Sequence, residues 1–476
     1  MGNPLISALK PIFYFAEARL QANGGVVYAV ADGRRQQRSD LAFRYFSWRK
    51  LINFLRVEVA LRFGFSRLGG TPYEWEIDTT NICQLKCPLC HTGLGTINRE
   101  KGVMHYDVFT RTVDQIKNHA VWLTLYSWGE PFLNKRIHDM VSYAHDNGIA
   151  TIISSNLNKP LREEEAEKII KSGLDTMIIS LDGITQEVYE IYRVNGHLDR
   201  VLDNIRLLAR KKAELGYSTP YLEWQFIVMR QNEHQIEGAR ELAKELGVDS
   251  IIFKKVDFPH GEDNNATAQK WLPQNTPEYL RGNAFDKPYK ETGTRCWRLW
   301  RTAVVNWDGG LAPCCYLTDK ADDFGDVNVD SVQEIKNNSN YVTSRALFKK
   351  GTMPDHKTGC LMCPVYTETA AGVARGPVKF MTEQQPMVLA TAATNNGSNG
   401  NGLRGDPKTA LDATVPLTRK GIIGSNGSNG DGVVTAGVLP IASAGPKTNG
   451  VHSTPVGEVV PLKTPLTTDE KVVNRR

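Results

Sequence analysis

Three cysteines on one short segment carry the clearest chemical signal in this chain. Cys83, Cys87 and Cys90 have the spacing Cys-x₃-Cys-x₂-Cys and follow a predicted strand, residues 73–80. Three thiolates on one loop can bind three irons of a 4Fe–4S cube and leave the fourth iron without a protein ligand. The sequence therefore predicts an iron–sulfur site with one iron open to another molecule.

Zinc and disulfides are the alternatives for these three cysteines. A structural zinc site uses four Cys or His ligands in paired spacings, and His91 is adjacent to Cys90, too close to complete a tetrahedron easily. Disulfides need an oxidising compartment, and residues 1–14 lack the pattern of a secretory signal. The iron–sulfur interpretation is therefore favoured.

The cysteine loop resembles the signature of the radical S-adenosylmethionine (radical SAM) enzymes. In that family the open iron binds SAM, and an electron from the cluster splits the sulfonium to give a 5′-deoxyadenosyl radical that takes a hydrogen atom from the substrate. Leu89 departs from the pattern, because an aromatic residue is common at this position. The resemblance implies SAM and a 4Fe–4S cluster as cofactors, and a low-potential electron donor such as flavodoxin or ferredoxin.

Segments further along the chain are similar to the positions that bind SAM in this family. The segment 128–131 resembles the one that meets the methionine ammonium, and Arg193 resembles the arginine that pairs with the methionine carboxylate. Short polar side chains at two later strand ends suit the ribose hydroxyls. The resemblance thus implies a SAM site made by Gly129, Glu130, Pro131, Ser155, Asn156, Ser180, Asp182 and Arg193.

A second set of cysteines follows near the end of the cysteine-containing region. Cys296, Cys314, Cys360 and Cys363 supply four thiolates, enough to close a 4Fe–4S cube, although the spacing alone also fits zinc. The set resembles the shortened SPASM module, called twitch, of radical SAM enzymes, which implies one auxiliary 4Fe–4S cluster. Cys315 is left over, and we interpret it as a small buried apolar residue, while a ligand swap with the adjacent Cys314 stays open.

Composition and charge narrow the class of protein. A chain of 476 residues with 41% hydrophobic residues can build one large or two moderate cores. The net charge of +5 comes from basic residues that are spread along the chain, and this does not indicate a nucleic-acid partner. The sequence has no uninterrupted stretch of 18 apolar residues, so it predicts no membrane-spanning helix. Cysteines in metal-site spacings without an export signal predict a cytoplasmic location.

Alternating hydrophobic patterns predict an α/β fold. Strands are predicted at 73–80, 121–127, 150–154, 176–181, 222–228 and 250–255, and helices at 106–117, 135–147, 162–172, 198–215 and 233–246. Six such repeats, most helices being closed by glycine, predict a partial (βα)₆ TIM-like barrel, the fold that the resemblance also implies.

The chain divides by composition into five parts. We expect an N-terminal helical segment (1–70), the radical SAM barrel (71–256), a connector (257–290), the SPASM/twitch module (291–370) and a disordered low-complexity tail (371–476).

A basic, amphipathic helix is predicted at residues 47–65. Its apolar residues are Trp48, Leu51, Leu55, Val59 and Phe63, with arginines and a lysine between them. Such a helix either packs on the following domain or lies on a membrane surface. We favour packing, and peripheral membrane contact through residues 47–65 stays open.

The resemblance implies a two-electron oxidation, because in this family an auxiliary cluster can accept an electron from the substrate radical. The cysteine spacing is nearest to that of one branch of the family, the 2-deoxy-scyllo-inosamine dehydrogenases. We therefore expect a dehydrogenase-like oxidoreductase of a small molecule: a polyol, a sugar or a lipid head group. The alternatives are an enzyme that modifies a peptide or protein, and a non-catalytic iron–sulfur or zinc scaffold. The sequence assigns no catalytic base.

Overall fold

The computed structural model describes residues 26–29, 44–258, 265–280, 295–349, 354–363 and 366. The strands are β1 (Val26–Ala29), β2 (Glu74–Ile77), β3 (Trp122–Thr124), β4 (Ala150–Ser155), β5 (Thr176–Ser180), β6 (Tyr221–Val228), β7 (Ser250–Lys255), β8 (Thr302–Val305), β9 (Gly310–Ala312) and β10 (Gly325–Asp326). The predicted tail (371–476) and part of the predicted connector lie outside the described residues.

The helices are distributed over the whole described chain. They are α3 (Trp48–Phe63), α4 (His91–Leu94), α5 (Tyr106–Ile116), α6 (Ile137–Asp146), α7 (Glu163–Lys171), α8 (Gln186–Tyr192), α9 (Leu198–Glu214), α10 (Ile236–Leu246), α11 (Asn265–Trp271), α12 (Arg298–Arg301), α13 (Val332–Ile335), α14 (Ser339–Ala346) and α15 (Gly359–Met362).

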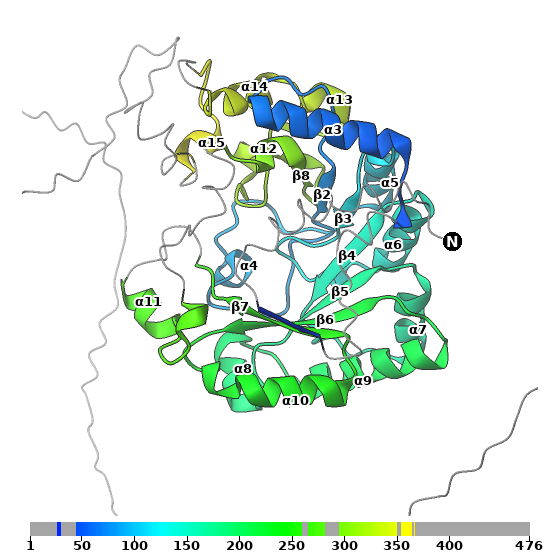
Figure 1. Ribbon diagram of the computed structural model, residues 1–476, viewed down its shortest axis with the longest axis vertical. Coiled ribbons are helices and arrows are strands. Elements are labelled where there is room, and N and C mark those ends of the chain that lie inside the picture. The colour runs from blue at the N-terminus through cyan, green and yellow to red at the C-terminus, as the bar shows by residue number, and fades with distance from the viewer. Residues whose placement is uncertain are drawn as a thin grey trace, which may run out of the picture. The chain divides into compact units, whose positions relative to one another are not determined.

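Six parallel strands form the centre of the sheet. β2 to β7 are neighbours in the order of the sequence, and each pairs in parallel with the next. Helices α5, α6, α7, α9 and α10 lie along the outside of these strands (Figure 1). This arrangement confirms the predicted partial (βα)₆ barrel, whose strands end at one common edge.

The sheet continues past the barrel at both edges. β8 pairs in parallel with β2, from Glu74 opposite Thr302 to Ile77 opposite Val305, and β9 and β10 follow as antiparallel strands. At the other edge β1 pairs antiparallel with β7. The prediction of a helical segment over residues 1–70 did not include this strand. The second cysteine module is therefore part of the same sheet as the barrel.

Glycines end the outer helices as their positions predict. Gly148, Gly173, Gly216 and Gly247 follow α6, α7, α9 and α10, and their φ angles of 69, 83, 70 and 69° are left-handed. A side chain is strained in this conformation, whereas glycine adopts it freely. Each glycine thus turns the chain from a helix back toward the next strand.

Helix α3 packs on the barrel, but with a different face from the predicted one. Leu51, Phe54, Val57 and Leu61 are buried, whereas Trp48, Leu55, Val59 and Phe63 of the predicted apolar stripe are exposed. The prediction of packing is correct and the prediction of its face is wrong, because α3 carries apolar residues on two sides. Within the described residues, no helix is both long and apolar enough to cross a bilayer.

A buried arginine joins the cysteine-loop side of the barrel to the second module. Arg99 donates to Asp308 at 2.7 Å and to Asp323 at 2.6 Å, and its side chain is 2% exposed. Beside it, the Trp307 indole N–H donates to the Glu100 carbonyl oxygen at 2.9 Å. A guanidinium between two carboxylates satisfies charges that would otherwise be costly to bury.

Replacing Arg99 with Ala should lower the free energy of unfolding by about 3 kcal/mol, because two carboxylates would stay buried without this partner. The control Arg206→Ala removes exposed pairs with Asp203 and Glu245, and should cost less than about 1 kcal/mol. Urea denaturation followed by tryptophan fluorescence measures both. Equal midpoints for the two variants would show that the Arg99 contacts do not hold the module.

Candidate functional site

The cysteine loop is folded tightly between β2 and α4. The Cys90 N–H donates to the Cys87 carbonyl oxygen at 3.2 Å, and the Lys86 N–H donates to the Val194 carbonyl oxygen at 3.0 Å. Gly93 lies so close that a Cβ there would stand 2.2 Å from the Cys87 carbonyl oxygen. The backbone of the loop is therefore held on both sides, by α4 and by the segment that follows α8.

An apolar cluster surrounds the three thiols, and we call it the loop site. Its buried members are Leu85, Cys87, Leu89, Tyr192, Met229, Val256 and Trp271, and Cys83, Cys90, Ile227, Phe258 and Leu272 pack at its edge. Burial raises the pKa of Cys83 to about 12 and also raises the pKa of Cys87. The loop site is thus a dry environment, in which thiolates need a cationic partner.

The donor set of the loop site fits an iron–sulfur cube. In the described part of the chain, no three Cys, His, Asp or Glu side chains gather as they would around a single metal ion. Cys83, Cys87 and Cys90 instead share one apolar cluster. Three thiolates in a dry loop are what a 4Fe–4S cube with one open iron takes from a protein, so these residues would hold the cluster.

Arg193 reaches the loop site from the end of α8. Its Nε and Nη2 atoms lie 2.7 and 2.6 Å from Asp182 Oδ2, and its Nη1 lies 3.8 Å from the Cys87 sulfur. Burial alone would lower the pKa of Arg193, but attraction to Asp182 and Cys87 raises it well above its ordinary value. Two predicted SAM-binding residues, Asp182 and Arg193, therefore form a charged pair beside a predicted cluster ligand.

Glu130 joins the segment that follows β3 to the end of β4. Its Oε1 accepts from the Ser155 hydroxyl at 2.8 Å, and its Oε2 accepts from the Asn156 N–H at 2.9 Å. Burial raises the pKa of Glu130, and these hydrogen bonds act in the opposite direction. The structure thus brings three predicted SAM-binding residues together, with the carboxylate as a positioning group between two strands.

Asn156 also touches the cysteine loop. Gln84 Nε2 donates to Asn156 Oδ1 at 2.8 Å, and Asn156 Nδ2 lies 3.6 Å from the Cys83 sulfur. Ser180, at the end of β5, shares a hydrogen bond of 3.1 Å with Ser154. The amide of Gln84, which sequence reasoning missed, therefore links the predicted ribose side to the predicted cluster side.

Gly129 is required by a close approach of two backbones. A Cβ at Gly129 would stand 1.7 Å from the Thr80 carbonyl oxygen. The next N–H, of Glu130, donates to the Ile82 carbonyl oxygen at 2.9 Å. Pro131 begins a buried 3₁₀ turn, Pro131–Leu133. The predicted Gly-Glu-Pro segment thus runs directly against the start of the cysteine loop.

Four cysteines of the second set line one small cavity, which we call the module site. It is formed by Cys296, Arg298, Leu299, Pro313, Cys314, Leu317, Phe348, Cys360, Cys363 and Tyr366. Burial raises the pKa of Cys296 to about 11 and of Cys314 to about 12. Cys315 is not among these lining residues. The thiols brought together are the four predicted ones, and they would hold the auxiliary cluster.

An acidic pair on β2 and its edge was missed in the sequence. Glu76 is a half-buried residue near Arg298, Ser127 and Cys315, and burial raises its pKa while Ser127 and Arg298 lower it. Asp78 is buried beside the backbone of residues 127–129, and burial raises its pKa to about 7. Acidic residues two apart in a buried strand were the signal that could have found them.

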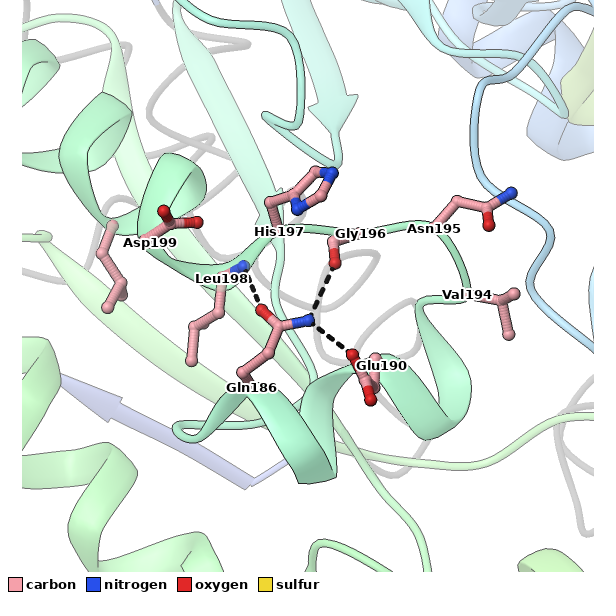
Figure 2. A pocket seen from close by; sticks show the side chains of 9 residues that line it. Gln186, Glu190, Val194, Asn195, Gly196, His197, Leu198 and Asp199 are labelled. Carbon is pink, nitrogen blue, oxygen red and sulfur yellow. Dashed lines mark hydrogen bonds between the residues drawn. The ribbon is translucent and has the colours of Figure 1, made fainter.

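A separate, open pocket lies between α8 and the start of α9 (Figure 2). Its volume is about 830 Å³. The Gln186 side chain lies in its wall, where its Nε2 donates to the Glu190 carboxylate at 2.8 Å and to the Gly196 carbonyl oxygen at 3.0 Å. None of the predicted cofactor-binding or metal-ligating residues lines it. This pocket is therefore distinct from the loop site and the module site.

Two family models match the parts of the chain that carry these sites. Residues 77–222 match the radical SAM superfamily, and residues 296–364 match an iron–sulfur cluster-binding domain named SPASM. The chain has a radical SAM domain and a SPASM domain. The radical SAM domain binds SAM and a 4Fe–4S cluster, and the SPASM domain binds auxiliary iron–sulfur clusters, as predicted.

Curated relatives of the radical SAM domain differ in their activities. A tungsten-containing aldehyde ferredoxin oxidoreductase cofactor-modifying protein of Pyrococcus furiosus is 25% identical, over 50% of this chain and 69% of its own length. A PqqA peptide cyclase of Bradyrhizobium diazoefficiens is 25% identical, over 40% of this chain and 48% of its own length. This chain therefore spans about half the length of the second relative.

The narrower resemblance to 2-deoxy-scyllo-inosamine dehydrogenases is not confirmed. The structure of BtrN in complex with AdoMet and 2-DOIA is 16% identical, covers 59% of this chain and 87% of its own, and has a TM-score of 0.36. The curated relatives named above are a cofactor-modifying protein and a peptide cyclase. The radical SAM and SPASM domains are shown, and the dehydrogenase class is a proposal.

Replacing Gly129 with Ala should lower the rate of reductive SAM cleavage about a hundredfold, because a displacement of roughly 1 Å at a reacting site has this effect. The added Cβ would force the backbone at position 129 away from Thr80 and Asn81, which lead into the cysteine loop. The measurement is 5′-deoxyadenosine formed with dithionite under anaerobic conditions. In the control Gly69→Ala the added Cβ meets no atom within 4 Å, and unchanged cleavage in both variants would contradict this reasoning.

Proposed function

We propose that this chain is a radical SAM oxidoreductase that oxidises a small polar molecule, such as a polyol, a sugar or a lipid head group. When bound, SAM and the first cluster supply a 5′-deoxyadenosyl radical that removes a hydrogen atom, and the auxiliary cluster supplies an acceptor for the remaining electron. Flavodoxin or ferredoxin is the proposed donor to the first cluster. The proposal is supported by the way in which this chain's residues connect the loop site to the module site.

Trp128 is the observation that carries the proposal. Its indole N–H donates to the Cys315 carbonyl oxygen at 3.2 Å, and its own carbonyl oxygen accepts from the Thr92 hydroxyl at 2.7 Å. The His91 ring packs edge-on against it, with the ring centroids 4.7 Å apart. One residue in the segment that follows β3 thus touches both the helix after the cysteine loop and the module that carries the second set of cysteines.

Charged groups lie where a substrate between the two sites would need partners. Arg298 Nη1 lies 4.0 Å from the Cys315 sulfur, and Glu76 is near both Arg298 and Cys315. Oxidation of an alcohol releases a hydrogen atom, an electron and a hydroxyl proton. Because burial raises the pKa of Glu76, its carboxylate is a stronger base than an exposed one and is suited to accept that proton. Arg298 would bind an oxygen of the substrate.

Modification of a peptide or of another enzyme's cofactor is the second candidate function. Two relatives support it, since one is named a peptide cyclase and another a cofactor-modifying protein, and it is about as plausible as oxidation of a small molecule. Glu76, Arg298 and Trp128 would then contact a side chain or a cofactor ring instead of a polyol. The two candidate functions differ in the class of substrate, so identifying the substrate decides between them.

Reconstituted protein should contain about eight irons, the content of two 4Fe–4S cubes. Replacing Cys83, Cys87 and Cys90 together with Ala should lower the iron content to about four and abolish 5′-deoxyadenosine formation. Replacing Cys360 and Cys363 should also lower it to about four but leave SAM cleavage intact. Anaerobic iron and sulfide analysis with the deoxyadenosine assay measures both outcomes, and zinc at the module site would remove the electron acceptor from the proposal.

The substrate class is tested by a panel of cyclitols, free sugars and peptides. We expect a cyclitol or sugar to increase deoxyadenosine formation and to lose two hydrogens, as mass spectrometry would show. Glu76→Gln should then lower product formation by about 10²-fold or more while leaving SAM cleavage without substrate unchanged. The control is Glu241→Gln, an exposed residue paired with Lys244. Turnover of a peptide alone would replace the first candidate with the second.

A further inference from the structure

The outward face of α3 is an apolar stripe, and we call it the α3 stripe. Its residues are Trp48, Ile52, Leu55, Val59 and Phe63, which are spaced by four, three, four and four positions and therefore lie along one side of the helix. Their exposed fractions run from 47% for Leu55 to 67% for Phe63. Phe65, just past the helix, is exposed and stacks on Phe63 with the ring centroids 5.9 Å apart.

The opposite face of α3 is fixed to the barrel and to the second cysteine module, so the helix cannot turn to bury the stripe. Glu58 accepts from Arg301 at 2.7 and 2.6 Å, and from the Tyr73 hydroxyl at 2.7 Å. Asn53 exchanges two hydrogen bonds of 2.8 Å with the backbone of Thr71. Figure 1 shows α3 lying along the outside of the fold beside α13 and α14. The stripe is therefore a rigid surface.

The exposed charged residues of α3 itself are all positive. Arg49, Arg56, Arg62 and Arg67 are exposed on α3 or just after it. Glu58 is the one acidic residue between positions 47 and 67, and it is engaged by Arg301 and Tyr73. An apolar stripe flanked by arginines, with aromatic residues at both ends, matches the boundary between lipid tails and anionic head groups.

We propose that the α3 stripe binds the surface of a membrane that contains anionic lipids. A second copy of the chain is a poorer occupant, because pairing two such faces would place arginine against arginine. Anionic head groups supply the opposite charge, and the acyl boundary accepts the apolar side chains. Membrane binding is independent of the proposed reaction, although it would place the enzyme where lipid head groups are concentrated.

The test is co-sedimentation of the full-length protein with vesicles of phosphatidylcholine alone or with one quarter phosphatidylglycerol by moles. We expect binding to the anionic vesicles that weakens as salt is raised, and little binding to the neutral ones. Trp48→Ser with Phe63→Ser should lower the partition coefficient by roughly tenfold or more. Changing Arg49, Arg56 and Arg62 to Gln should lower the partition coefficient by about fivefold for each arginine.

Matched controls change residues of the same kinds elsewhere. Val329→Ser alters a side chain that is 81% exposed, and the triple change of Lys171, Arg206 and Lys244 to Gln removes three exposed cations. Both should bind as the wild type does. On the wild type alone, brominated anionic lipids should quench tryptophan fluorescence, which keeps the test independent of how the variants fold.

Three results would overturn the proposal. The first is no binding of the wild type to anionic vesicles, and the second is binding that the serine variant leaves unchanged. The third is a different occupant: concentration-dependent self-association that the serine variant abolishes would assign the stripe to a second copy. The same third result includes vesicle binding that appears only after residues 371–476 are deleted, which would make that part of the chain the occupant of the α3 stripe. Iron content and SAM cleavage, measured alongside, report separately on the proposed function.

Discussion

The pairing of β8 with β2 is the constraint on which the arrangement of both cysteine sites depends. These strands run in parallel, so the module that carries the second set of cysteines extends the sheet that carries the first. Arg99 and Trp128 add side-chain contacts across the same boundary. Backbone hydrogen bonds therefore set how the loop site and the module site lie relative to each other. Transfer of an electron through a shared substrate requires such a fixed arrangement.

Desolvation gives the two sites their common character. Burial raises the pKa of the thiols at both, and each site is lined mainly by apolar side chains. Against this background, carboxylates at the strand ends are expensive to bury. Glu130 and Asp182 meet that cost with hydrogen bonds that position neighbouring polar groups. Glu76 and Arg298 lie near each other and near Cys315, and the substrate proposal rests on them.

The same framework suits more than one substrate. A radical generated at one site and an electron acceptor at another are useful for oxidising an alcohol, and the relatives show that similar domains act on peptides and cofactors. The chain's own contribution is local: a charged pair near Cys315 and a rigid helix that presents apolar residues outward. We therefore propose that the chemistry is general to the domain pair, whereas recognition of the substrate depends on a few residues at its edges.

The sequence by itself determined whatever depends on neighbours along the chain. The cysteine spacing, the alternation of strands and helices and the stopping glycines are local signals, and the structure has the corresponding loop, elements and left-handed glycines. Tertiary structure decided the rest. Which face of α3 is buried, that β8 continues the barrel sheet, and that Cys314 rather than Cys315 lines the module cavity all depend on partners far away in sequence. Periodicity gives each element an apolar side, but only long-range packing selects which side meets the core.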